Sequence, residues 1–256
     1  MKRYILVLQF KINWVCIMNY GKMGANSFTT TRVGVLDAGL RSYMVAVYKH
    51  MSIALGLTGL IAFLVSSSPG LTNLIFGSSL RWVVIFAPLG MAVFMNTRFV
   101  YMSSEGARIS LWVYSALMGV SMASLFWLYT GASIARTFFI TASAFGAMSI
   151  YGYATKKDLS AMSSLFMMGL IGIIIASFVN LFMQSNAMSF IISIVGVGVF
   201  SFLTAYETQR LKSIYYQIAN DSSAAEKIAV FGALGLYMDF INLFISFLHF
   251  FGERRN

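Results

Sequence analysis

Two acidic side chains lie within long apolar stretches of the sequence, where no water is at hand to solvate an ionised carboxylate. Asp239 falls near the middle of 228–252, IAVFGALGLYMDFINLFISFLHFFG, and Glu207 falls near the end of the preceding apolar stretch. An ionised Asp at the centre of a membrane helix costs about 2.5–3.5 kcal/mol on insertion scales, so such a residue usually faces a partner or a water-filled cavity. Asn242 shares the helical face of Asp239 and adds secondary polar support.

Two carboxylates that face each other in a low-dielectric site share a proton and titrate as a coupled pair. When protonated, the pair is a closed, hydrogen-bonded latch. When deprotonated, it repels itself and attracts divalent cations such as calcium, which prefers carboxylate oxygens. Glu207 and Asp239 are therefore interpreted as a pH sensor on an ion pathway, with calcium as a bound or permeant ion.

Each acid also fits a purely structural role. Glu207 can form a salt bridge with Arg210, three residues along the same helix, and Asp239 can be a single buried acid that is hydrogen-bonded for packing. The predicted helix ends also separate the two acids, because Asp239 lies roughly 16 Å into its helix whereas Glu207 ends its own. The gap would close if the helices were tilted, or if the helix that carries Glu207 continued to Lys212.

The composition places these acids in a helical membrane protein. Of 256 residues, 59% are hydrophobic and only 10% are charged, whereas soluble domains carry about 25% charged residues. Two prolines and no separable strands favour helices over a barrel. The predicted fold class is an all-α polytopic bundle, with one seven-helix domain at 43–252. A cytoplasmic N-terminal segment at 1–42 precedes it and a short tail at 253–256 follows.

Seven apolar stretches are long enough to cross a bilayer, which requires roughly 20 residues. They are predicted at 50–66 (entered from Tyr43), 81–97, 109–130, 137–155, 159–183, 187–208 and 228–252. Residues 29–49 are expected to lie along the membrane surface as a short amphipathic segment, and 67–80 are expected to form a loop. Met18 and Met23 offer alternative initiation sites, in which case residues 1–22 are a start-site extension.

Basic residues mark the cytoplasmic side of the predicted bundle. They precede the first span and join spans two and three, four and five, and six and seven, whereas the alternate loops carry only Arg81 and Arg136. By the positive-inside rule the N-terminus is cytoplasmic, and an odd number of spans then places the C-terminus outside. Arg254 and Arg255 in the C-terminal tail argue against an outside location. Either the last segment re-enters the membrane, or the basic residues of the other loops outweigh these two arginines. We favour the second explanation. The formal charge of +10 comes from basic residues that are scattered through these loops. Such a distribution is typical of membrane topology and not of a nucleic-acid-binding surface. Membrane lipids are therefore expected partners, and nucleic acid is not.

Signatures of enzyme chemistry are missing from the sequence. It contains no phosphate-binding loop, zinc-protease, serine-hydrolase or dinucleotide-binding motif, and no set of nucleophile, base and oxyanion donors. Cys16 is the single cysteine, and His50 and His249 fall on different predicted helices. The protein is therefore predicted not to be an enzyme and to carry no cofactor.

Two segments carry a family resemblance: 205–212, AYETQRLK, and 235–252, GLYMDFINLFISFLHFFG, with weaker support from 37–44, 113–119 and 156–159. They resemble the transmembrane Bax inhibitor motif family (Bax inhibitor-1 family) in its bacterial branch. The resemblance implies a seven-helix bundle in the bacterial inner membrane, with the last helix surrounded by the other six. It also implies a pH-sensitive calcium leak with two acids as the sensor at the pore.

By motif, Glu207 and Asp239 occupy the positions of these two acids. The family often has Asp where this chain has Glu207, whose extra methylene group lengthens the reach of the carboxylate. Arg98 matches a family arginine that latches to the helix-six acid in the closed state.

Bacterial members of the family also resemble modulators of a membrane-anchored ATP-dependent quality-control protease. The alternative function is therefore a regulatory membrane protein that binds this protease, recognised through its N-terminal segment. Deletion of residues 1–32 is expected to abolish such binding and to leave a leak intact. A secondary transporter is less favoured, because the sequence shows no pair of broken helices.

Overall fold

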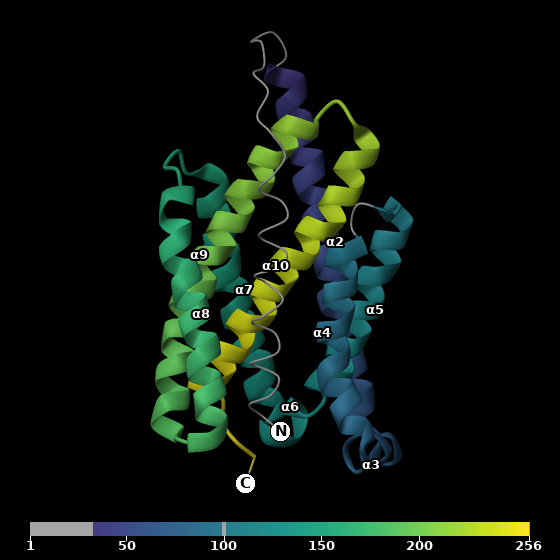
Figure 1. The fold of residues 1–256 in the computed structure, drawn as a ribbon, viewed down its shortest axis with the longest axis vertical. Helices are drawn as coiled ribbons and strands as arrows, with labels where there is room; N and C mark the ends of the chain where they lie inside the picture. Colours follow the sequence, from purple (N-terminus) through teal and green to yellow (C-terminus); the bar gives the residue numbers. More distant parts are fainter. Residues whose placement is uncertain (1–32, 99–100, 256) are drawn as a thin grey trace.

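The computed structural model describes residues 33–98 and 101–255, which form helices joined by short turns (Figure 1). In chain order these are α2 (Val33–Ser67), α3 (Pro69–Phe76), α4 (Leu80–Arg98), α5 (Ser104–Met122), α6 (Leu125–Leu128), α7 (Gly131–Ala154), α8 (Ser160–Met183), α9 (Asn186–Ile218) and α10 (Ser222–Phe251). They contain seven spans that are long and apolar enough to cross a membrane. The predicted all-α, seven-span fold is confirmed.

Short polar residues fix the starts of four of the long helices. The side chains of Ser103, Thr130, Ser185 and Asp221 each accept a hydrogen bond from the backbone N–H three residues later, at 2.9–3.2 Å. Each bond satisfies an N–H group that the first turn of a helix leaves without an internal partner. The connections before α5, α7, α9 and α10 can therefore be short.

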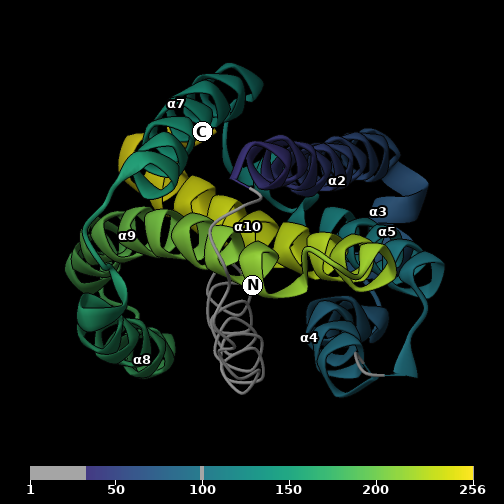
Figure 2. The same cartoon turned by 90° about the horizontal axis from the view of Figure 1, so that it is seen from above.

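The last helix, α10, runs through the centre of the bundle. Figure 2 shows it flanked by α2, α7 and α9, and it also contacts α5. Every residue of α10 in the range 228–246 is buried. The outer helices complete the bundle, with α4 packed on α5 and α8 packed on α9. The prediction that the last helix is central is confirmed.

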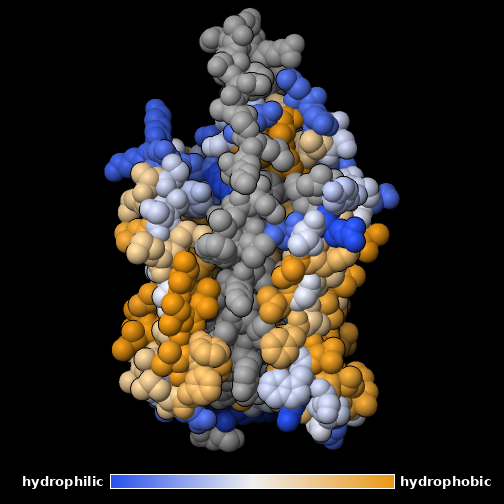
Figure 3. Space-filling model, viewed as in Figure 1, coloured by the Kyte–Doolittle hydropathy of each residue, from blue (hydrophilic) through white to orange (hydrophobic). Residues whose placement is uncertain are grey.

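The surface of the bundle has the polarity that a bilayer requires. On the face drawn in Figure 3, hydrophobic side chains cover the middle of the bundle and hydrophilic side chains gather towards its two ends. Large apolar side chains on the outer helices are widely exposed, for example Phe139, Met168 and Phe182. Lipid tails are the solvent that suits such a surface, so the protein is a multi-pass membrane protein.

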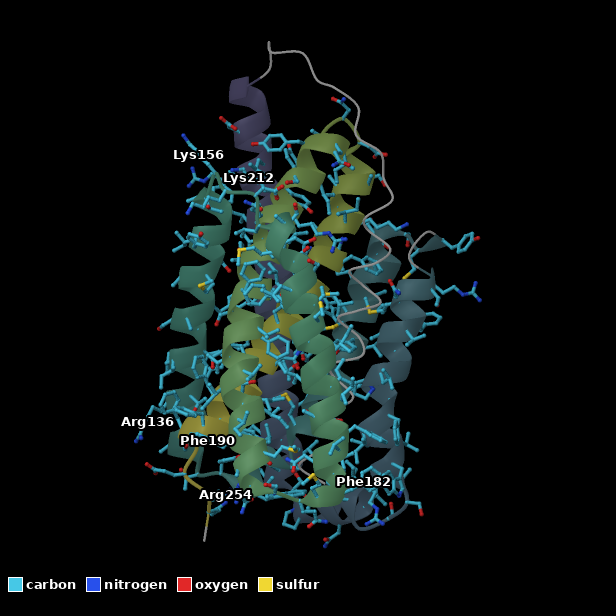
Figure 4. The ribbon with its side chains drawn as sticks, turned by 60° about the vertical axis from the view of Figure 1, so that its left-hand side comes forward. Arg136, Lys156, Phe182, Phe190, Lys212 and Arg254 are labelled. Atoms are coloured by element: carbon cyan, nitrogen blue, oxygen red, sulfur yellow. The ribbon has the colours of Figure 1, made fainter. Side chains whose placement is uncertain are left out.

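The two ends of the bundle differ in charge. We call the end with the 98–104, 154–160 and 218–222 connections the basic end, and the other the opposite end. Lys156 and Lys212 lie at the basic end, and Arg136 and Arg254 lie at the opposite end (Figure 4). The tail is joined to the opposite end, since the N–H of Thr130 donates to the carbonyl of Glu253 (3.2 Å). The helix α10 therefore crosses the whole bundle and does not re-enter.

The first helix begins earlier than predicted. The helix α2 is continuous from Val33 to Ser67, so residues 33–49 are its first turns and not a separate segment along the membrane surface. The bundle therefore starts before residue 43. Residues 1–32 lie outside the described residues, and with them the predicted start-site extension 1–22 and most of the N-terminal segment 1–42.

The helices at the basic end are longer than predicted. The helix α9 continues ten residues past 208, to Ile218, and α10 begins at Ser222 and not at 228. Charged residues lower the local hydropathy and so end a predicted span, but residues such as Arg210 and Lys212 are good helix formers and continue the backbone hydrogen bonds. Similarly, part of the predicted loop 67–80 is the short helix α3.

Candidate functional site

The acid of the central helix belongs to a stripe of small and polar residues on α10. Gly235, Asp239, Asn242 and Ser246 follow one another at intervals of three or four residues, so they share one face of the helix. Both ends of the stripe face α9. A Cβ atom on Gly235 would lie 3.4 Å from Oε2 of Glu207, and at the other end Ser246 lies against a glycine of α9.

These contacts fix the register between the two antiparallel helices. Gly235 is level with Glu207, and Ser246 is level with Gly196. Asp239 follows Gly235 by one turn, so it lies about 6 Å along the helix axis from the level of Glu207. The predicted separation of roughly 16 Å was too large because it assumed that both helices end nearer the acids. The structure therefore places Glu207 against Gly235, one turn before Asp239 on α10, and the pairing of the two acids stays a prediction.

Glu207 is buried next to a cation of its own helix. Nη1 of Arg210 lies 3.8 Å from Oε1 of Glu207, and both side chains are largely buried. This is the salt bridge that the spacing of the two residues allows. Beside it, a cavity of about 20 Å³ is lined by Glu207, Arg210 and the glycines Gly232 and Gly235. A cavity of this size holds about one water molecule.

Asp239 lies deeper than Glu207. Its exposed fraction is 1%, and that of Asn242 is 0%. Neither the oxygen nor the nitrogen of the Asn242 amide has a hydrogen-bond partner among the described residues. A buried amide without partners is rare in folded proteins and calls for an explanation such as a bound water molecule or ion. The polarity predicted around Asp239 is therefore present.

The far side of α10 is held by a hydroxyl pair that the sequence analysis missed. The hydroxyl of Tyr237 lies 2.7 Å from Oγ1 of Thr58 in α2, and Thr58 also lies within hydrogen-bond distance of the carbonyls of Ala54 and Ser115. A carbonyl only accepts, so the single proton of Thr58 goes to a carbonyl and Tyr237 donates to Thr58. The sequence signal that could have revealed this pair is Thr58, a hydroxyl residue inside the first apolar stretch.

The predicted latch is not formed in this structure. Arg98 is the exposed last residue of α4, and among the described residues it makes no ion pair with Glu207. Arg210 takes that place. The role of Arg98 stays a prediction.

The described residues do not form a closed metal cage. No group of three or more His, Cys, Asp or Glu side chains in the described ranges is placed to hold a metal ion. Calcium takes six to eight oxygen ligands, and Glu207 with Asp239 supplies at most four.

These features define the class of protein. It is an integral membrane protein whose buried central helix carries a buried acid, Asp239, and whose neighbouring helix α9 carries another, Glu207. The chain belongs to the Bax inhibitor-1 family, since the family model described as "Inhibitor of apoptosis-promoting Bax1" matches residues 40–256. The resemblance inferred from the sequence is thereby confirmed.

Relatives from several bacteria match over most of their length. The chain is 47% identical over 228 residues to the protein RP147 of Rickettsia prowazekii, which covers 89% of this chain and 96% of that protein. It is 42% identical over 220 residues to the inner membrane protein YbhL of Escherichia coli, which covers 85% of this chain and 94% of YbhL. A Caulobacter vibrioides protein is 42% identical over 229 residues, covering 86% and 92% of the two chains.

Proposed function

We propose that this protein is a pH-sensitive calcium leak channel gated by the paired carboxylates of Glu207 and Asp239. The observation that carries the proposal is the contact of Glu207 with Gly235, one turn before Asp239, together with the burial of both acids. Acids are costly inside a membrane bundle and mark ion or proton pathways there.

The gating mechanism follows from the charge of the pair. With one proton shared, the acids attract each other and hold α9 against α10. With both ionised, they repel each other in a medium of low dielectric constant, which favours separation of the helices and draws in a divalent cation. The flux of calcium, the substrate of the channel, is therefore expected to rise with pH.

In this proposal the described conformation is the closed state. The stripe on α10 is polar, but α9 opposes it with Leu203, one turn before Glu207, and with Phe200, one turn further on. Both side chains are fully buried, and the cavity beside Glu207 holds about one water molecule. Opening requires these two apolar side chains to move away from the stripe.

The proposed location is the bacterial inner membrane, with the N-terminus in the cytoplasm. The support for this orientation is the concentration of Lys and Arg at the basic end, which the positive-inside rule assigns to the cytoplasm. The relative YbhL is named an inner membrane protein. The C-terminal tail, at the opposite end, then lies outside. The proposal includes no enzymatic step.

Calcium flux into proteoliposomes, measured against pH with a trapped indicator, tests the proposal. The wild type is compared with Asp239→Asn and Glu207→Gln, and the control is Glu226→Gln, which removes an exposed acid from the same helix as Asp239. We expect flux that rises with pH in the wild type and control, and a flat pH profile in both other variants. Flux that stays pH-dependent in Asp239→Asn would refute the sensor.

A complete lack of flux above empty vesicles would favour the alternative function. In that case the protein is a regulator that binds a membrane-anchored ATP-dependent quality-control protease. The segment predicted to be recognised, residues 1–32, lies outside the described residues. Its deletion distinguishes the two functions, because binding of the protease would be lost while a leak would persist.

A further inference from the structure

A groove opens on the outside of the bundle between α2 and α7. Its volume is about 590 Å³, and Phe240 of α10 forms part of its floor. Figure 2 shows α2 and α7 on one side of α10, with α10 between and below them. Binding sites for small molecules commonly have volumes of about 300–1,000 Å³. The groove is therefore large enough to hold a ligand.

The length and direction of the groove match one leaflet of a bilayer. Along α2 its lining extends from Arg41 to Leu55, a rise of roughly 21 Å. Half of the hydrocarbon core is about 15 Å thick, so the groove has room for an acyl chain and the glycerol region above it. The rims carry the exposed apolar side chains Val45 and Ile150, so the groove opens towards lipid.

Cations gather where the groove meets the basic end. Arg41 lines this mouth and is exposed. Lys212 reaches the mouth from α9, because its Nζ donates to the carbonyl of Tyr153 (3.1 Å) and lies 5.0 Å from the centre of that ring. Lys156 lies at the same end (Figure 4). Two acids lie near these cations: Asp37 precedes Arg41 by one turn, and Asp158 follows Lys156 by two residues and accepts a hydrogen bond from the N–H of Ser160. The cations, which also include Lys157, outnumber the acids by four to two.

We propose that this groove binds one anionic phospholipid. The acyl chain lies along the apolar wall between α2 and α7, and the phosphate lies at the mouth against Arg41 and Lys212. Basic pockets between membrane helices suit anionic headgroups. The combination of an apolar groove one leaflet long with a cationic mouth favours such a lipid over a zwitterionic one.

The proposed lipid would touch both helices that carry the paired acids. Tyr48 lines the groove and its hydroxyl lies 3.3 Å from Oγ1 of Thr208, the residue after Glu207. Phe240 in the floor follows Asp239 directly. The groove thus includes the residue next to Asp239 and a tyrosine that contacts the residue next to Glu207, although the lipid site does not depend on the proposed leak.

Two glycine substitutions provide a matched test of the groove. Gly146 lines it, and a Cβ atom there meets no other atom within 4 Å, so Gly146→Phe would place a ring in the groove. Gly172 of α8 has equally open surroundings and is exposed outside the groove, so Gly172→Phe is the control. For the headgroup, Arg41→Gln is compared with Arg81→Gln at the opposite end.

Binding is measured by native mass spectrometry of the purified full-length protein, titrated with phosphatidylglycerol or phosphatidylcholine. We expect a 1:1 complex that prefers phosphatidylglycerol. Gly146→Phe is expected to weaken it roughly tenfold, the effect of about two displaced methylene groups. Arg41→Gln is expected to weaken it roughly fivefold, the effect of one basic residue near an anionic lipid. Both controls should bind as the wild type does.

Three results would overturn the proposal. The first is equal affinity of the wild type for the two lipids. The second is unchanged binding by Gly146→Phe, with its thermal unfolding in detergent showing a folded protein. The third is a dimer of the wild type that Gly146→Phe dissociates, since the groove would then hold a helix of a second copy. If Gly146→Phe does not fold, Arg41→Gln decides the outcome through its preference between the lipids.

Discussion

The packing of α7 against α9 leads to a sharp prediction at Gly152. A Cβ atom on Gly152 would overlap the carbonyl oxygen of Ala205 and would lie 2.8 Å from its Cα. Ordinary contact for a Cβ atom begins at 3.4 Å, and the opposing atoms are backbone, which cannot rotate away as a side chain can. In Gly152→Ala the two helices must therefore separate by at least about 0.6 Å, the difference between 3.4 and 2.8 Å.

The expected cost follows from this separation. A gap of about 0.5–1 Å forfeits a quarter to a half of the dispersion energy of each atom pair, and overpacked substitutions typically cost about 1–3 kcal/mol. Gly146→Ala, six residues earlier on α7, is the control because its Cβ atom meets nothing within 4 Å. Gly146→Ala should raise the free energy of unfolding by about 0.5–1 kcal/mol, because alanine is more favourable than glycine within a helix. Gly152→Ala gains the same helix propensity, so the two variants are expected to differ by the cost of overpacking alone, about 1–3 kcal/mol, with Gly152→Ala the less stable.

The assay is the free energy of unfolding in mixed micelles, obtained by titration with a denaturing detergent and followed by circular dichroism. Both variants are measured beside the wild type under one set of conditions. If Gly152→Ala were as stable as Gly146→Ala, the close approach of α7 to α9 would be wrong. Because Ala205 lies two residues from Glu207, the same variant should also disturb the pH dependence of the proposed leak.

Two further predictions concern hydroxyl and carboxyl groups. Tyr237→Phe removes the hydrogen bond to Thr58 and should lower the free energy of unfolding by about 1 kcal/mol; a double-mutant cycle with Thr58→Val measures the coupling, and additive effects would contradict the pair. At the start of α8, hydrogen bonds from the hydroxyl and N–H of Ser160 hold the pKa of Asp158 below its ordinary value. A lowered pKa means that the ionised form stabilises the folded state, so this contribution is present at neutral pH and is lost as the pH falls through the folded-state pKa. Asp158→Asn should therefore lower the thermal midpoint at neutral pH but not in acid, and a difference that persists unchanged in acid would contradict this role.

The sequence was informative wherever membrane burial alone decides the outcome. The seven spans follow from the long apolar stretches. The family resemblance follows from the segments around Glu207 and Asp239, and it was this resemblance that implied the central position of the last helix. An acid in such a stretch is conspicuous because the bilayer offers it no water. The choice of these two residues therefore needed no knowledge of the fold.

The distance between the two acids could not be obtained in this way. It depends on where α9 ends and α10 begins, and charged residues at the basic end concealed both boundaries. The register itself depends on contacts such as Gly235 against Glu207, which join residues that no pattern along one helix relates. The groove between α2 and α7 was missed for the same reason, since Gly146 is informative only once Met44 and Phe240 are known to lie opposite it.

The central position of α10 also has a consequence for how the chain is made. Translation produces α10 after every other described helix, yet α2, α5, α7 and α9 all pack on it. Until it enters the membrane, those helices have no common partner and the surfaces that will contact it face lipid or one another. The bundle can therefore reach its final packing only after Asp239 has been inserted. A ribosome that stops between α9 and α10 leaves a product that has six of the seven spans but lacks the helix on which α2, α5, α7 and α9 pack.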